Sequence, residues 1–169
     1  MTVHTTLDSP LGPLLLVGEP VPTAPGGTAL TSLSLPAQAR PAVVQDHWTH
    51  DPAAFDTAAA QLREYFDGRR TSFDLAFTPG RGSAFQHRVW QALEDIPYGS
   101  TVSYGALAAR IGAPRAAVRA VGTAIGANPL LVVRPCHRVI GANGALTGYA
   151  GGIPSKERLL VLEGALLAG

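Results

Sequence analysis

The chain contains one cysteine, Cys136, among its 169 residues. A single thiol cannot form a disulfide within the chain, so a packed apolar core must hold the fold together. Hydrophobic residues make up 46% of the sequence, enough for such a core in one domain or two small ones. No apolar run is long enough to cross a bilayer, and no secretory signal pattern is visible at the N-terminus. We therefore expect no membrane partner and a cytoplasmic, reducing location, where a free thiol stays usable.

Charged and titratable side chains surround the cysteine in sequence. Arg134 and Arg138 flank it, and His137 follows it directly. A thiol acts as a nucleophile only as thiolate, and neighbouring cations or an imidazole favour that form. A free cysteine is more often a small buried hydrophobe. Because two arginines and a histidine would be unusual around such a residue, we expect Cys136 to be reactive.

The net charge of +1 hides an asymmetry between the two halves. Residues 1–79 hold four arginines against eight carboxylates, a balance of −4. Residues 80–169 hold eight arginines and one lysine against four carboxylates, a balance of +5. Between Ile96 and Lys156 there is no Asp or Glu at all. This basic half indicates a polyanionic partner.

The N-terminal half predicts a small α/β scaffold without chemistry of its own. Residues 2–8 and 13–18 predict a hairpin, residues 30–35 and 73–77 two further strands, and Asp51-Pro52 the start of a helix that ends at Asp67-Gly68. His47 and His50 lie near two aspartates, but no thiolate or further histidine is close in sequence. We interpret them as part of a surface loop rather than as metal ligands.

The C-terminal half predicts a helix-turn-helix. Ser83 should cap a helix ending near Ile96, a short helix should cover residues 103–110, and Pro114 should open the next one at its first position. The exposed side of that last helix carries arginine and small residues, without long side chains for reading base edges. Two glycines there, Gly122 and Gly126, each lower helix stability by about 1 kcal/mol relative to Ala. They indicate that the helix backbone comes close to another molecule.

The last fifty residues predict a further set of elements around the cysteine stretch. Residues 141–144 are typical of a hairpin turn, and residues 147–152 predict a flexible glycine-rich loop. Pro154 should open a final helix with Leu159, Leu162 and Leu166 directed inward and Glu163 among them. A carboxylate on a largely apolar helix usually points to solvent. If Glu163 is buried it needs a partner, and the His137 imidazole is the candidate.

Several motifs together resemble the O6-alkylguanine-DNA alkyltransferase (methylated-DNA–protein-cysteine methyltransferase) family. In chain order they are Ile96-Pro97-Tyr98-Gly99, Ser103-Tyr104-Gly105, Arg119-Ala120-Val121-Gly122, Asn128-Pro129, Pro135-Cys136-His137-Arg138-Val139-Ile140, Gly148-Tyr149-Ala150-Gly151-Gly152 and Leu162-Glu163-Gly164. The resemblance implies an α+β fold. Residues 1–78 would form a ribonuclease-H-like α/β scaffold domain, and residues 79–169 a mostly helical, winged-helix-like domain with the helix-turn-helix and the active site.

The resemblance also implies a DNA repair protein that works once. It would move an alkyl group from O6 of guanine in double-stranded DNA to Cys136, without metal or cofactor. The damaged nucleotide would be flipped out of the duplex, which costs a few kcal/mol. Arg119 would replace the flipped base, with its helix in the minor groove. We expect a monomer, and the sequence leaves cooperative binding along DNA open.

Residue roles follow from the same resemblance. Cys136 would accept the alkyl group, His137 would take the thiol proton through a water, and Glu163 would orient His137. Tyr104 would donate its hydroxyl to the guanine, and Asn128 would brace the active-site turn. The remaining substrate contacts would be the Cys136 and Val139 carbonyls, the Ala150 amide and the Tyr149 ring. DNA contacts beyond Arg119 would come from Arg115, Ala120, Gly122, Thr123 and Arg134.

The chain departs from the family pattern in three places. Arg134 replaces a residue that is normally aliphatic. It could lower the thiol pKa, contact a phosphate or point to solvent, and our hypothesis is that it aids DNA binding more than chemistry. The stretch from Pro114 to Arg119 is one residue longer than the commoner spacing. With no second cysteine, the zinc site of some relatives is predicted to be absent.

Three other classes of protein would fit parts of the sequence. A non-catalytic lesion-binding relative would lack a cysteine at position 136. A helix-turn-helix transcription regulator would display long base-reading side chains and a dimerisation segment. A cysteine hydrolase would need an oxyanion hole and multiple turnover. The presence of the thiol and the small-residue helix favour the alkyltransferase.

Overall fold

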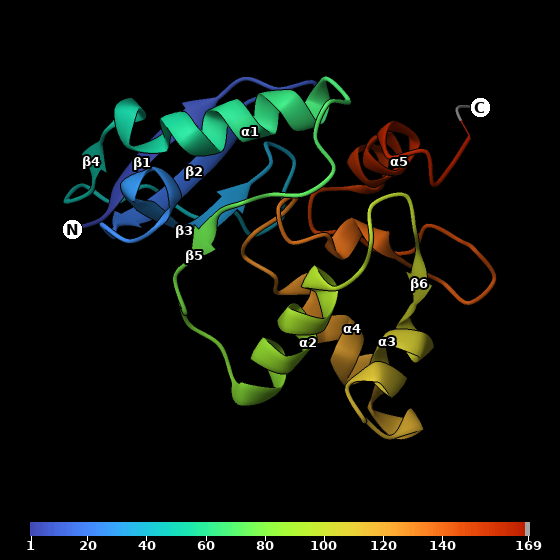
Figure 1. The fold of residues 1–169 in the computed structure, drawn as a ribbon. Coiled ribbons are helices and arrows are strands. Elements are labelled where there is room, and N and C mark those ends of the chain that lie inside the picture. Colours follow the sequence, from blue (N-terminus) through green and yellow to red (C-terminus); the bar gives the residue numbers. More distant parts are fainter. Residues whose placement is uncertain (168–169) are drawn as a thin grey trace. The chain divides into compact units, whose positions relative to one another are not determined.

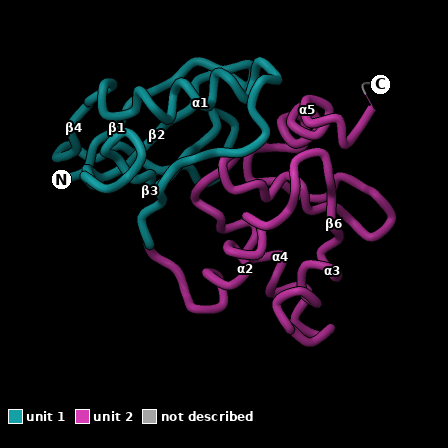
Figure 2. Tube along the Cα trace, viewed as in Figure 1, with its two compact units in different colours: residues 1–80 teal, residues 81–169 magenta. Residues whose placement is uncertain are grey.

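The computed structural model describes residues 1–167, and the chain forms two compact units, Met1–Gly80 and Arg81–Gly169 (Figure 2). The first unit is built on a β-sheet and the second is mostly helical, so the predicted α+β class is confirmed. Among residues 1–167, no helix has both the length and the apolar character that crossing a membrane requires.

The first unit contains a five-stranded sheet in the order β4-β1-β2-β3-β5. Strands β1 (Val3–Leu7), β2 (Leu14–Pro20) and β3 (Thr28–Ser34) form an antiparallel meander, which confirms the predicted hairpin. The short strands β4 (Thr49–His50) and β5 (Ala76–Phe77) run parallel to β1 and β3. The strand predicted over residues 73–77 is therefore too long. The Gln61 side chain binds the backbone N–H and C=O of Asp74, which gives this segment partners other than a neighbouring strand.

Helix α1 (Asp56–Phe66) covers one face of this sheet (Figure 1). Leu62 and Tyr65 of the helix are fully buried, as are Leu16 and Leu33 of the sheet. The predicted start at Asp51-Pro52 is a 3-10 turn, η2 (Pro52–Phe55), in which Asp51 makes no side-chain cap. A second 3-10 turn, η1 (Pro25–Gly27), lies in the loop before β3.

Three helices form the body of the second unit: α2 (Ala84–Glu94), α3 (Tyr104–Arg110) and α4 (Val118–Gly126). As predicted, Ser83 caps α2, here through a capping box with Gln86. Trp90 Nε1 of α2 donates to the carbonyl of Ala124 in α4 at 2.8 Å, which joins the two helices. Pro114 does not open α4. It precedes a 3-10 turn, η3 (Arg115–Ala117), that occupies the stretch before α4.

The active-site stretch lies beyond α4. The 3-10 turn η4 (Cys136–Arg138) leads into β7 (Val139–Ile140), which pairs in parallel with β6 (Val102–Ser103). The tight turn predicted at residues 141–144 is present, since the Gly144 N–H donates to the Gly141 carbonyl at 2.9 Å. The hairpin predicted with it is wrong, because β7 pairs with β6 from before α3. The last helix, α5 (Ile153–Leu162), buries Leu159 but leaves Leu162 and Leu166 half-buried, because it ends at Leu162.

Candidate active site

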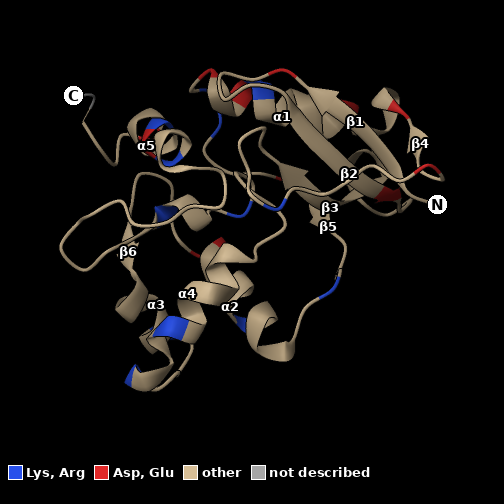
Figure 3. Ribbon diagram, turned by 180° about the vertical axis from the view of Figure 1, so that it is seen from behind, with Lys and Arg blue, Asp and Glu red and all other residues tan. Residues whose placement is uncertain are grey.

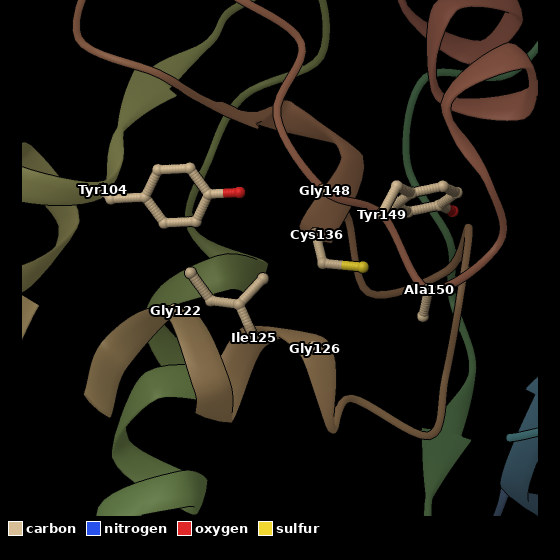
Figure 4. A pocket seen from close by; sticks show the side chains of 8 residues that line it. All are labelled: Tyr104, Gly122, Ile125, Gly126, Cys136, Gly148, Tyr149 and Ala150. Carbon is tan, nitrogen blue, oxygen red and sulfur yellow. The ribbon is translucent and has the colours of Figure 1, made fainter. Parts of the chain in front are cut away.

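A cavity of about 130 Å³ in the second unit has Cys136 in its lining. Its wall combines residues of α3 and α4 with residues of the loop before α5: Tyr104, Gly122, Ile125, Gly126, Cys136, Gly148, Tyr149 and Ala150. In Figure 4 the Tyr104 and Tyr149 rings lie on either side of the Cys136 sulfur. The thiol itself is 2% exposed, so the cavity is its route to a substrate.

Asn128 holds the turn that carries the cysteine. Its amide nitrogen donates to the carbonyls of Leu130 and Arg134, each at 3.2 Å, and its oxygen accepts from the Leu130 N–H at 3.1 Å. The turn includes Val132 at φ 70°, a conformation unfavourable for a β-branched residue. Strain of this kind costs about 1–3 kcal/mol and persists only where surrounding contacts fix it. The buried Asn128 amide supplies such contacts.

A buried carboxylate lies behind the cysteine. Glu163 Oε2 is 2.8 Å from His137 Nε2, and both side chains are fully buried. Arg138 binds the same carboxylate through Nε at 2.7 Å and Nη2 at 2.9 Å. Arg138 is thus a site residue without a predicted role. The guanidinium of Arg138 balances the negative charge of Glu163, which would otherwise be buried without a counter-charge.

The imidazole of His137 is arranged as a neutral base. Burial lowers its pKa, and the partner that opposes this shift is Glu163. With Nε2 against the Glu163 carboxylate, we assign the proton to Nε2 and the lone pair to Nδ1. Nδ1 is buried and has no hydrogen-bond partner within residues 1–167. It is therefore available to accept a proton.

The thiol is not the preformed thiolate that its sequence neighbours indicate. Burial raises the pKa of Cys136 to about 11, although a hydrogen bond from Asn128 and the charges of Lys156 and Arg134 act in the opposite direction. Desolvation outweighs the nearby cations because the sulfur is enclosed by protein. A base must then remove the proton when the reaction takes place.

Lys156 is a site residue that the sequence analysis missed. This lysine of α5 is 1% exposed, and its Nζ donates to the carbonyls of Val139 at 2.6 Å, Gly148 at 3.1 Å and Thr147 at 3.2 Å. It thereby fixes the loop of residues 147–148 against the strand that follows the cysteine. The signal was present in the sequence, because Lys156 lies three and seven residues before Leu159 and Glu163, on the same buried helix face.

The other predicted pocket residues meet around the cavity. Tyr104 lies at the start of α3 and donates its hydroxyl to the Thr147 carbonyl at 2.9 Å. The hydroxyl of Tyr149 is buried, and burial together with the nearby Cys136 raises its pKa well above the usual range. The Val139 carbonyl already accepts from Lys156, and that of Cys136 from the Val139 N–H, so each has one lone pair left.

The predicted DNA-contacting residues of α4 and η3 lie on the surface. Arg115, Arg119, Ala120 and Thr123 are exposed, and Gly122 is half-buried. Neither α3 nor α4 contains an acidic residue, and Figure 3 shows only basic charge on them. Arg119 lies in the first turn of α4, so the longer spacing after Pro114 leaves it presented to solvent.

Arg134 differs from this group, because its side chain is directed inward. It is 8% exposed, and its guanidinium carbon lies 5.4 Å from the centre of the Trp90 ring. A phosphate contact would require the side chain to leave that ring. This geometry argues against the DNA-binding role expected for Arg134.

The described residues contain no metal-binding cluster. Within residues 1–167, no group of three or more His, Cys, Asp or Glu side chains is arranged to hold a metal ion. His47 and His50, considered in the sequence, are both exposed in the first unit.

Comparison with known proteins gives consistent matches over both units. Residues 2–79 match the 6-O-methylguanine DNA methyltransferase, ribonuclease-like domain, and residues 84–165 match the DNA binding domain of the same family. The chain is 52% identical over 164 residues to the methylated-DNA–protein-cysteine methyltransferase of Mycobacterium tuberculosis, covering 96% of this chain and 93% of that protein. The corresponding protein of Methanosarcina acetivorans is 44% identical, with 96% and 98% covered.

A solved structure has the same fold. The crystal structure of Mycobacterium tuberculosis OGT in complex with DNA superposes with a TM-score of 0.85 at 50% identity, covering 96% of this chain and 93% of that one.

The raised pKa of the thiol predicts how the free protein reacts with a small alkylating agent. The rate of Cys136 alkylation by iodoacetamide should rise about tenfold per pH unit from pH 7 upward, because only the thiolate reacts. The midpoint should lie near 11. Mass spectrometry of the single-cysteine chain measures the rate, and the urea-unfolded chain is the control, with an ordinary thiol midpoint. A folded-state midpoint below that of the unfolded chain would contradict the burial argument.

Proposed function

Since the chain belongs to the 6-O-methylguanine DNA methyltransferase family, we propose that it repairs DNA by moving an alkyl group from O6 of guanine to Cys136. The observation that carries this proposal is the enclosed sulfur in the lining of a cavity, with a neutral buried histidine next to it in sequence. The cysteine is not regenerated, so each molecule acts once. Residues 79–169 carry the chemistry and the DNA contacts, and residues 1–78 are the scaffold.

The transfer is an in-line displacement at the alkyl carbon. The Cys136 sulfur forms a bond to that carbon while the carbon–O6 bond breaks, and the electron pair leaves with the guanine. His137 Nδ1 takes the thiol proton through a water molecule, and the positive charge that develops on the imidazole is stabilised by Glu163 at 2.8 Å. No metal or cofactor is needed, because a soft sulfur nucleophile displaces a delocalised leaving group.

The guanine is held by groups around the cavity. The Ala150 N–H, which has no hydrogen-bond partner within the described chain, donates to O6. The second lone pairs of the Cys136 and Val139 carbonyls accept from the exocyclic amine, and the Tyr149 ring forms one wall. Tyr104 donates its hydroxyl to the ring of the leaving guanine. It must exchange its present partner, the Thr147 carbonyl, for the base.

The surface of α4 is suited to the minor groove of double-stranded DNA. A side chain at Gly126 would meet no atom within 4 Å, and one at Gly122 only the Tyr104 ring at 3.9 Å. Packing inside the protein therefore does not require glycine at either position. A DNA duplex that comes close to the helix backbone would require residues without side chains there. Arg119 occupies the space of the extruded nucleotide, and Arg115, Ala120, Gly122 and Thr123 face the backbone. We further propose that the protein acts as a monomer in the cytoplasm.

Incubation with a duplex containing one O6-methylguanine should transfer one methyl group to the peptide containing Cys136. Added excess DNA should give no second turnover, because the thioether is stable. Intact-mass and peptide mass spectrometry measure both. Cys136→Ser should abolish transfer and keep DNA affinity within about threefold. A wild-type chain without an adduct, or repeated turnover by it, would refute the proposal.

Arg119→Ala should slow methyl transfer from duplex DNA by at least tenfold, because the flipped nucleotide is no longer replaced in the stack. Its reaction with the free base O6-benzylguanine should stay within twofold of wild type, since no flipping is needed there. Arg40→Ala, at an exposed site in the first unit, is the matched charge control. If Arg119→Ala slowed both substrates equally, Arg119 would act on the pocket rather than on the duplex.

A further inference from the structure

Arg134 lies two residues before Cys136, and its side chain is buried. We infer that Arg134 is a positioning residue for Cys136, which couples helix α2 to the Asn128 amide and places a positive charge beside the sulfur. This inference rests on the proposed function, because it takes Cys136 to be the residue that accepts the alkyl group.

Contacts with α2 and with Asn128 fix the place of the Arg134 guanidinium. It stacks over Trp90 at 5.4 Å, Nε lies 4.0 Å from Glu94 Oε2, and Nη1 donates to Asn128 Oδ1 at 3.4 Å. Trp90 and Glu94 both belong to α2, and Trp90 is held in turn by the Ala124 carbonyl. The arginine thus extends the packing of α2 and α4 to the amide that braces the active-site turn.

The contact with Asn128 has a chemical consequence. The Asn128 oxygen accepts from the Leu130 N–H and from the cationic Nη1 of Arg134, which fixes the orientation of the amide. A charged donor on the oxygen also polarises the amide and makes its N–H₂ group a stronger donor. That N–H₂ group donates to the carbonyls of Leu130 and Arg134, so the polarised amide holds the turn before the sulfur more firmly.

Arg134 therefore acts on the sulfur directly through its charge and indirectly through Asn128. Glu94 weakens the direct effect, because it lies against the same guanidinium and is itself half-exposed. The other titratable groups around the sulfur, from every neighbouring element, are Tyr104, His137, Arg138, Tyr149, Lys156 and Glu163. Of the cations, Lys156 and Arg134 are the two whose charge favours the thiolate. Arg134 supplies one of these two charges.

Three substitutions separate charge from packing. Arg134→Met keeps an unbranched stem against Trp90 but removes the charge, Arg134→Lys keeps the charge, and Arg134→Gln keeps a donor without charge. The rate of Cys136 alkylation by iodoacetamide at fixed pH reports the thiolate fraction in each variant, and thermal unfolding checks the fold. Arg40→Met is the matched control for loss of one exposed positive charge.

In Arg134→Met and Arg134→Gln the thiol pKa should rise, so alkylation at pH 8 should fall by more than threefold. Arg134→Lys should change the alkylation rate at pH 8 less than threefold, and Arg40→Met should leave that rate unchanged. A merely structural role would slow alkylation of Arg134→Lys as much as that of Arg134→Gln, or would lower the unfolding temperature with an unchanged alkylation rate. Either result overturns the inference. If Arg134→Met fails to fold, Arg134→Gln decides by the same criterion.

Methyl transfer from an O6-methylguanine duplex distinguishes this inference from the proposed function. At saturating DNA, the single-turnover rate of Arg134→Met at pH 8 should fall in parallel with alkylation, while DNA affinity and its salt dependence stay unchanged. A smaller salt dependence would place Arg134 on a phosphate and refute the inward role. If the wild-type chain transferred no methyl group but the alkylation shift was found, the repair function would fail and the positioning role would stand.

Discussion

The site depends on the buried carboxylate of Glu163 and on its hydrogen bonds with Arg138 and His137. Glu163 is 4% exposed, and an isolated charge at such a depth would be strongly unfavourable. Arg138 supplies the opposite charge through two hydrogen bonds, while His137 supplies a third partner. Because Arg138 already neutralises the carboxylate, His137 need not be protonated, and burial keeps it neutral. The histidine can therefore act as a base, which a permanently charged imidazolium could not.

The same burial sets the reactivity of the thiol. A nucleophile with a pKa near 11 is almost entirely protonated at neutral pH, which protects an acceptor that can be used only once. Proton removal is then linked to the reaction through the histidine. The surrounding backbone must hold these groups in place without a disulfide. Asn128 fixes the turn before the cysteine, and Lys156 fixes the loop on the far side of the cavity.

Local sequence signals predicted the parts of the structure that depend on neighbours in the chain. The Ser83 capping box, the hairpin of β1 and β2, and the pairing of Glu163 with His137 were all accessible from residue types and spacing. The parallel pairing of β7 with β6 was not, because the partner strand lies more than thirty residues earlier. A turn signal at residues 141–144 favoured the wrong partner.

Side chains whose behaviour depends on burial could not be predicted either. Arg134 and Arg138 flank the cysteine symmetrically in sequence. Both were expected to favour the thiolate, and Arg134 also to aid DNA binding. In the structure Arg134 stacks on Trp90 and Arg138 binds Glu163. Desolvation, rather than these charges, sets the direction of the pKa shift of the thiol. Lys156 was overlooked because a lysine is usually exposed. Its helical spacing with Leu159 and Glu163 would have identified it.

The central claim is that His137 is a neutral base with its proton on Nε2. Nitrogen NMR of the histidine-labelled protein tests it directly, with the His137→Gln variant assigning one signal among five histidines. The account predicts a neutral ring at pH 7, protonated at Nε2, that stays neutral as the pH falls below about 6.5. An imidazolium at pH 7, or a neutral ring protonated at Nδ1, would contradict it.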